Sequence, residues 1–115
     1  SREPYLEYFT LPGNERDYEV NWVPVHFFIV DSDPREPDGV GASRAQAAWL
    51  QGALAASEAE WKVVIMHHPA YSSSRHGSNL SMRWPYAEWG ADIVLAGHDH
   101  VYERLEVDGF PYITA

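Results

Sequence analysis

Apolar residues along this chain fall into short runs that are separated by polar loops. Residues 17–23, DYEVNWV, alternate polar with apolar side chains, and this period of two predicts a half-buried strand. Residues 25–33, VHFFIVDSD, are almost continuously apolar until their final acidic residues, and residues 61–66 and 91–97 are similarly apolar. Continuous apolar runs of this length are typical of strands that are covered on both faces.

The segments between and after these runs predict two helices and a hairpin. Ser43 and Gln46 have the spacing of a capping box, in which each side chain satisfies a backbone amide of the first helical turn. Apolar residues then recur on one helical face, at Trp49, Leu50, Ala53 and Leu54. A short helix is expected around residues 84–90, and residues 100–115 predict a β-hairpin that turns at Asp108–Gly109. Strand, helix and strand in succession favour an α/β layered fold.

Composition limits the classes of partner. The 115 residues, the size of one domain or part of one, carry 17 acidic and eight basic side chains, a formal charge of -9. Such a surface repels nucleic acid and anionic membranes, so we expect neither as a partner. The absence of cysteine excludes disulfides, thiolate metal sites and cysteine nucleophiles. The chain starts without Met and stops within an apolar segment, PYITA, so we expect a fragment.

Histidines mark the candidate chemistry. Five of the six follow predicted strands or lie in the next loop: His67, His68, His76, His98 and His100. The carboxyl edge of an open α/β sheet is where ligands bind, and neutral imidazole is the commonest protein metal ligand. We therefore predict a metal site where two strand ends meet. In an extended His-x-His both imidazoles project to one face, so each can serve one of two metals while Asp99 points away.

Each of these histidines also has a purely structural interpretation, because a single histidine at a strand end more often only forms hydrogen bonds. His26 lies inside an apolar strand and is expected in the core or an interface. His68 either supports a neighbouring ligand or points away from it. His76 lies in a serine-rich loop and is expected to be exposed.

Other polar residues near the strand ends have simpler interpretations still. Asp31 and Asp33 precede a proline-rich loop and are predicted to form a turn rather than a metal site. The serines at 72–74 lack the GxSxG setting of a nucleophile. Glu103 and Arg104 are predicted to orient loops beside the site.

Two blocks carry a family resemblance. VVIMHHPAYSSS and ADIVLAGHDHVYER resemble the last two signature blocks of the calcineurin-like metallophosphoesterases. GHDHVYER, MRWPYAEWGAD and VHFFIVDSD are similar to the purple acid phosphatase branch, and the resemblance runs from about residue 5 onward. It implies a layered α/β/β/α sandwich, a mixed sheet with flanking helices, and a dinuclear metal site that hydrolyses phosphate monoesters.

The resemblance also implies roles for the histidines. His67 and His98 bind one metal and His100 binds the other. His76 contacts phosphate and protonates the leaving group, and His68 is a second substrate-binding candidate. The metals implied are iron with zinc, manganese or a second iron, and the family implies a secreted or periplasmic location.

Earlier signature blocks of the family are missing from this sequence, including its bridging aspartate, its GDxxY-type block and its GNH block. The GNER at residues 13–16 has Asn14 but no following histidine, and is predicted to be a turn. We therefore expect residues 1–115 to be the C-terminal portion of a single catalytic domain, which alone binds at most one metal tightly and hydrolyses little ester. A phosphodiesterase or nucleotidase, and a non-catalytic metal-binding or interaction domain, remain as alternatives.

Overall fold

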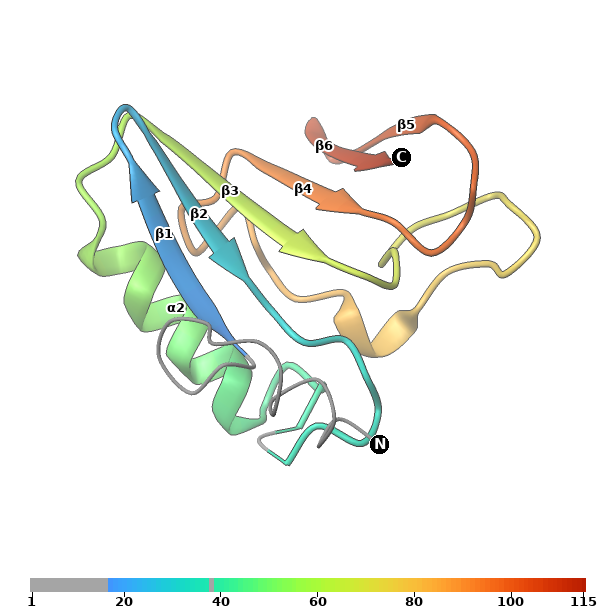
Figure 1. Cartoon of the computed structure of the whole chain (residues 1–115), viewed down its shortest axis with the longest axis horizontal. Coiled ribbons are helices and arrows are strands. Elements are labelled where there is room, and N and C mark those ends of the chain that lie inside the picture. The colour runs from blue at the N-terminus through green and yellow to red at the C-terminus, as the bar shows by residue number, and fades with distance from the viewer. Residues whose placement is uncertain (1–16, 38) are drawn as a thin grey trace, which may run out of the picture.

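A computed structural model describes residues 17–37 and 39–115 (Figure 1). Six strands form one mixed sheet in the order β1-β2-β3-β4-β6-β5. Their bounds are β1 (Tyr18–Trp22), β2 (Val25–Ile29), β3 (Trp61–Met66), β4 (Ile93–Ala96), β5 (Glu103–Val107) and β6 (Phe110–Thr114). Among the described residues, the sheet is accompanied by α2 (Ala45–Ala56) and the short 3-10 helix η1 (Leu80–Met82). In this described part of the chain, no helix is long and apolar enough to cross a membrane.

The four central strands run parallel, and the two edge strands β1 and β5 run antiparallel to their neighbours. Parallel neighbours need a crossover connection, and α2 supplies the one between β2 and β3. Val64 on β3 pairs with Phe28 on β2 and with Val94 on β4. Because of this register, β3 and β4 end side by side at Met66 and Ala96.

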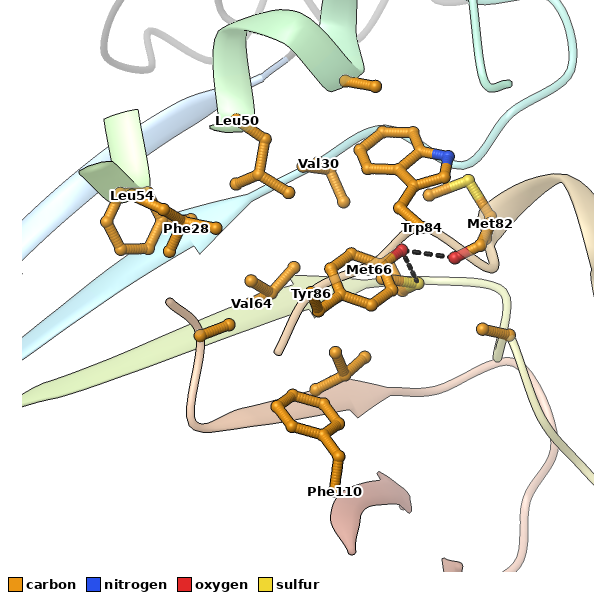
Figure 2. Close-up of a cluster of buried hydrophobic side chains, with 14 residues drawn as sticks. Phe28, Val30, Leu50, Leu54, Val64, Met66, Met82, Trp84, Tyr86 and Phe110 are labelled. Carbon is orange, nitrogen blue, oxygen red and sulfur yellow. Dashed lines mark hydrogen bonds between the residues drawn. The ribbon is translucent and has the colours of Figure 1, made fainter. Parts of the chain in front are cut away.

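One face of the sheet holds the core. Residues that pair across strands share a face, so Phe28, Val64 and Val94 point the same way, and each is at most 1% exposed. Figure 2 shows side chains from α2, from η1 and from the segment after η1 packed on this face. Those side chains are Leu50, Leu54, Met82, Trp84 and Tyr86. The Tyr86 hydroxyl donates to the carbonyl of Met82, which satisfies it in the core.

The opposite face of the sheet is also apolar, but neither described helix packs on it. Trp22, Val25 and Trp61 form one row of paired residues on this face. The next row consists of Val20, Phe27, Val63 and Ile93. Trp22 is 75% exposed and Trp61 is 51% exposed, so large apolar surface remains uncovered by the described residues.

Most strand predictions are confirmed. The runs at 25–33, 61–66 and 91–97 contain β2, β3 and β4, and the hairpin turns at Asp108–Gly109. Both turn residues have positive φ, 53° and 79°, as a two-residue hairpin turn requires. The half-buried strand at 17–23 exists as β1, but its residues 19–22 are exposed because it lies at the sheet edge.

Two helix predictions are wrong. Residues 86–90 form turns, because Met82, Trp84 and Tyr86 are buried at every second position, a period that a helix cannot place on one face. The capping box does not form: α2 has Arg44 as its N-cap residue, with no side-chain cap. Gln46 is instead fully buried, and its amide bonds both backbone groups of Asp31. The apolar face of α2 is confirmed, with Leu50 and Leu54 buried.

The polar residues of β2 and of the loop after it match their predictions. His26 lies in the core as expected, with its Nδ1 2.7 Å from the Ser57 hydroxyl. Asp31 and Asp33 form turns, since each carboxylate accepts the backbone N–H two residues later at 2.8 Å. The predicted turn at residues 13–16 lies outside the described residues.

Candidate metal centre

The candidate site begins where β3 and β4 end next to each other. Met66 pairs with Ala96, so His67 and Gly97 leave the sheet as neighbours. The backbone N–H of Gly97 donates to the carbonyl of His67 at 3.0 Å, which extends the pairing by one step. The histidine blocks are thus held together by the backbone of a parallel sheet, at the edge where ligands bind in α/β folds.

A tight turn directs His98 back toward β3. His98 has a φ of 71°, and the N–H of Asp99 donates to the carbonyl of Gly97 at 2.9 Å. A bond between residues two apart, with positive φ at the central residue, is the strained form of the γ-turn. The expectation of an extended His-x-His is therefore wrong, because the chain folds back at the first histidine.

The turn brings three imidazoles together. One ring nitrogen from each of His67, His68 and His98 lies within 4.8 Å of the other two. The Nε2 of His67 and the Nδ1 of His98 are 3.1 Å apart. The structure thus brings together His67 and His98, which the sequence predicted as ligands of one metal, and adds His68 beside them.

His68 is held in place by a serine that sequence analysis overlooked. The Ser32 hydroxyl lies 2.7 Å from Nδ1 of His68 and accepts the backbone N–H of His68 at 2.9 Å. Burial lowers the pKa of His68, and the nearby His67 and His98 lower it further. The neutral imidazole that this favours is the form that binds metal.

The distances and donors fit a metal ion. Two nitrogens that each lie about 2.0–2.1 Å from one tetrahedral or octahedral ion are roughly 2.8–3.4 Å apart. The 3.1 Å between His67 and His98 falls inside that range, although an imidazole–imidazole hydrogen bond has the same length. Imidazole donors suit zinc, iron and manganese, so the donor set does not select one of them.

His76 and His100 lie beside this group. The His76 ring centroid is 4.5 Å from that of His98, and the His76 side chain is 52% exposed. His100 is exposed, and together with His76 and His98 it lines a recess of about 300 Å³. His100 is outside the three-histidine group, so the structure does not bring it onto the ion that His67 and His98 would share.

Asp99 lies on the other side of the γ-turn. It is 4% exposed and lies outside the three-histidine group. Hydrogen bonds from Ser74, first, and from the backbone of His76 lower the pKa of Asp99. Sequence analysis did not predict this contact of Asp99 with the loop that carries His76. The only signal in the sequence was an aspartate that stands between two histidines.

The comparisons with known proteins identify the family. The sequence model of the calcineurin-like phosphoesterases matches residues 2–102. The chain belongs to this family. The resemblance seen in the two histidine blocks is confirmed.

The relatives of this calcineurin-like phosphoesterase are acid phosphatases. Tartrate-resistant acid phosphatase type 5 of Rattus norvegicus is 32% identical over 115 residues, 96% of this chain and 32% of the relative. Fe(3+)-Zn(2+) purple acid phosphatase 12 of Arabidopsis thaliana is 36% identical over 75 residues, 57% of this chain and 16% of the relative. The chain therefore spans at most about a third of the length of these relatives.

A solved structure shares the fold. The purple acid phosphatase from yellow lupin (Lupinus luteus) seeds superimposes with a TM-score of 0.76 at 19% identity, over 97% of this chain and 25% of that one. The predicted α/β class with a mixed sheet and flanking helix is thus confirmed.

Proposed function

We propose that this chain forms part of a metal-dependent phosphatase that hydrolyses phosphate monoesters. The observation that carries the proposal is the 3.1 Å contact between His67 and His98 at adjacent strand ends. Membership in the phosphoesterase family and the acid phosphatase relatives support the reaction class. The name of the Arabidopsis relative supports iron with zinc as the metal pair.

In the proposed site, His67 and His98 hold one ion and His100 contributes to a second. Bound ions at these residues supply polarisation of phosphoryl oxygen and a nucleophile at neutral pH. His68 is held by Ser32, and burial lowers its pKa and so favours the neutral ring; it would donate one hydrogen bond to the phosphate or serve as a further ligand.

His76 is the proposed general acid. Its ring stands over His98, and half of the side chain is open to solvent, where a leaving group departs. Its Nε2 lies 3.7 Å from a carboxylate oxygen of Asp99, which provides a negative neighbour for the protonated ring. A correctly placed acid of this kind contributes about 10²–10⁴-fold to the rate.

We further propose that residues 1–115 form the C-terminal portion of one catalytic domain. In the described part of the chain, the only group of three candidate metal ligands consists of imidazoles, without a bridging carboxylate. Two cations about 3.5–4 Å apart repel strongly unless an anion bridges them. The second sheet of the sandwich would cover the apolar face that carries Trp22 and Trp61. We therefore expect the isolated chain to bind one ion and to hydrolyse little phosphate ester. We also propose that the parent protein is secreted or exported to the periplasm.

Phosphate release tests the function. The chain is expressed joined to the preceding part of the catalytic domain from a purple acid phosphatase, and loaded with iron and zinc. We expect p-nitrophenyl phosphate to be hydrolysed faster than the bis-ester, and activity to fall at least about 10²-fold in His98→Ala. Glu60→Ala, an exposed side chain just before β3 and so at the end of that strand opposite to the site, is the control. Preference for the bis-ester would point to a phosphodiesterase, and activity that survives His98→Ala would refute the proposal.

A further inference from the structure

We propose that Asp99 and Glu103 are positioning residues that grip the loop at residues 72–76 from two sides and hold His76 over His98. This inference rests on the proposed role of His76 as the general acid. Neither carboxylate would touch substrate. Each acts through the loop that carries His76.

Asp99 grips one side of the loop. The Ser72 hydroxyl donates to Oδ2 of Asp99 at 3.4 Å, and the Nε2 of His76 lies 3.7 Å from its Oδ1. The Ser72 and Ser74 hydroxyls are themselves 2.9 Å apart, so they form one network with the carboxylate. The Asp99 side chain is only 3% exposed, which strengthens these bonds because water does not compete for them.

Glu103 grips the other side. Its Oε1 accepts the backbone N–H of Ser73 at 3.0 Å, and its Oε2 accepts the Ser73 hydroxyl. Glu103 is the first residue of β5 and pairs with Thr114 on β6, so this anchor belongs to the sheet. Hydrogen bonds from Ser73 lower the pKa of Glu103, so its carboxylate stays charged at neutral pH.

The two anchors explain why three consecutive serines occupy this loop. Ser72 and His76 contact Asp99, and Ser74 contacts the Ser72 hydroxyl. Ser73, between the two other serines, contacts Glu103 instead. Ser72 and Ser73 each supply a donor to a carboxylate, Ser74 bonds the Ser72 hydroxyl, and none acts as a nucleophile. The grip matters because His76 is half exposed, and without anchors the entropy of a loop would disperse its ring.

The grip also connects the two histidine blocks. Asp99 lies between His98 and His100, and its fold-back γ-turn aims the carboxylate at the loop while His98 faces His67. A single turn therefore sets both the metal ligand and the proposed acid. Preorganisation of this kind is what acid catalysis requires, because a displacement of about 1 Å costs roughly 10²-fold in rate.

Limited proteolysis and NMR test the grip on the 115-residue chain. Trypsin cleaves after the exposed Arg75 only when the loop opens, so the rate of that cut, followed by mass spectrometry, reports anchoring. The variants are Asp99→Asn, Glu103→Gln and the double variant Ser72→Ala/Ser74→Ala, which leaves both carboxylates intact. Glu106→Gln is the matched control, because Glu106 is an exposed carboxylate on β5 whose partner among the described residues is Arg104.

We expect the cut after Arg75 to accelerate about tenfold in Asp99→Asn and in the serine variant, since charged hydrogen bonds are lost. The Hε1 resonance of His76, assigned with His76→Gln, should move toward its solvent-exposed position in the same variants. Zinc affinity should change less than about threefold, since the ligands at His67 and His98 remain. Glu106→Gln should alter none of these.

The inference is overturned if cleavage and the His76 resonance are unchanged while the variants remain folded by circular dichroism. It is also overturned if Glu106→Gln has the same effect as Glu103→Gln. A chain that binds no metal but still shows the loop response would refute the proposed function and leave the grip intact.

Discussion

The Nε2 of His67 and the Nδ1 of His98 lie 3.1 Å apart, although the two residues are separated by 31 positions in the sequence. The parallel pairing of β3 with β4 brings their backbones together, and the γ-turn at His98 then rotates its ring toward His67. Positive φ at a non-glycine residue costs roughly 1–3 kcal/mol and persists where the surroundings enforce it. The strained turn at His98 gives the two ring nitrogens the separation that binding to one shared metal ion requires.

Ser32 should control the orientation of His68. In Ser32→Ala the Nδ1 of His68 and its backbone N–H lose their shared partner, which is 2% exposed. We expect a loss of about 1–3 kcal/mol in the free energy of unfolding, measured by urea denaturation. Ser81→Ala, which removes an exposed hydroxyl that donates to Asn79, is the control and should stay within about 0.5 kcal/mol. Equal effects of the two variants would contradict this role.

Gln46 should contribute more to the free energy of unfolding than a glutamine on the surface of a helix does. Its amide accepts the N–H of Asp31 at 2.6 Å and donates to the carbonyls of Asp31 and Gly39. Gln46→Ala leaves these buried groups unsatisfied, so the urea midpoint should fall by an amount equivalent to about 2–3 kcal/mol. Gln51→Ala, on the exposed side of α2, is the matched control and should be nearly neutral. A neutral Gln46→Ala would show that water replaces the amide.

Tyr112 should make stability fall at high pH. Burial first, and Tyr71 second, raise the pKa of Tyr112 to about 12. Because the folded pKa lies above the unfolded value of about 10, this contribution to stability is complete below pH 10 and is lost as the pH rises toward 12. Burial also raises the pKa of Tyr86, so absorbance titration at alkaline pH should show two late-ionising tyrosines. One of them should be lost in Tyr112→Phe, and both should persist in Tyr102→Phe. An unchanged late amplitude in Tyr112→Phe would contradict the assignment to Tyr112.

Local patterns of apolar residues correctly predicted the strands, because each strand carries its own apolar run. β3 matches its apolar run from Trp61 to Met66, because both of its faces are apolar: one packs in the core and the other is uncovered by the described residues. The segment after η1 was wrongly predicted as a helix, since its buried residues follow a period of two set by the core beneath them. Gln46 was misassigned for a similar reason: its partners, Asp31 and Gly39, are distant in sequence.

The histidine blocks predicted where the candidate site lies, at two adjacent strand ends, but they did not predict its geometry. Strand ends placed His67 and His98 together, because parallel pairing is predictable from a strand–helix–strand pattern. The γ-turn was not predictable, since it is a backbone conformation that histidine rarely adopts. The partners of His68 and Asp99 come from loops 36 and 27 residues away, so no local pattern records them.

Metal stoichiometry tests the central claim most directly. The purified chain is loaded separately with iron, zinc or manganese, dialysed, and analysed for metal per chain, together with His67→Ala, His98→Ala and His100→Ala. We predict one tightly held ion, lost in His67→Ala and in His98→Ala, and retained in His100→Ala because His100 lies outside the three-histidine group. Retention of the ion in His67→Ala, or two tightly held ions in the unaltered chain, would contradict the account.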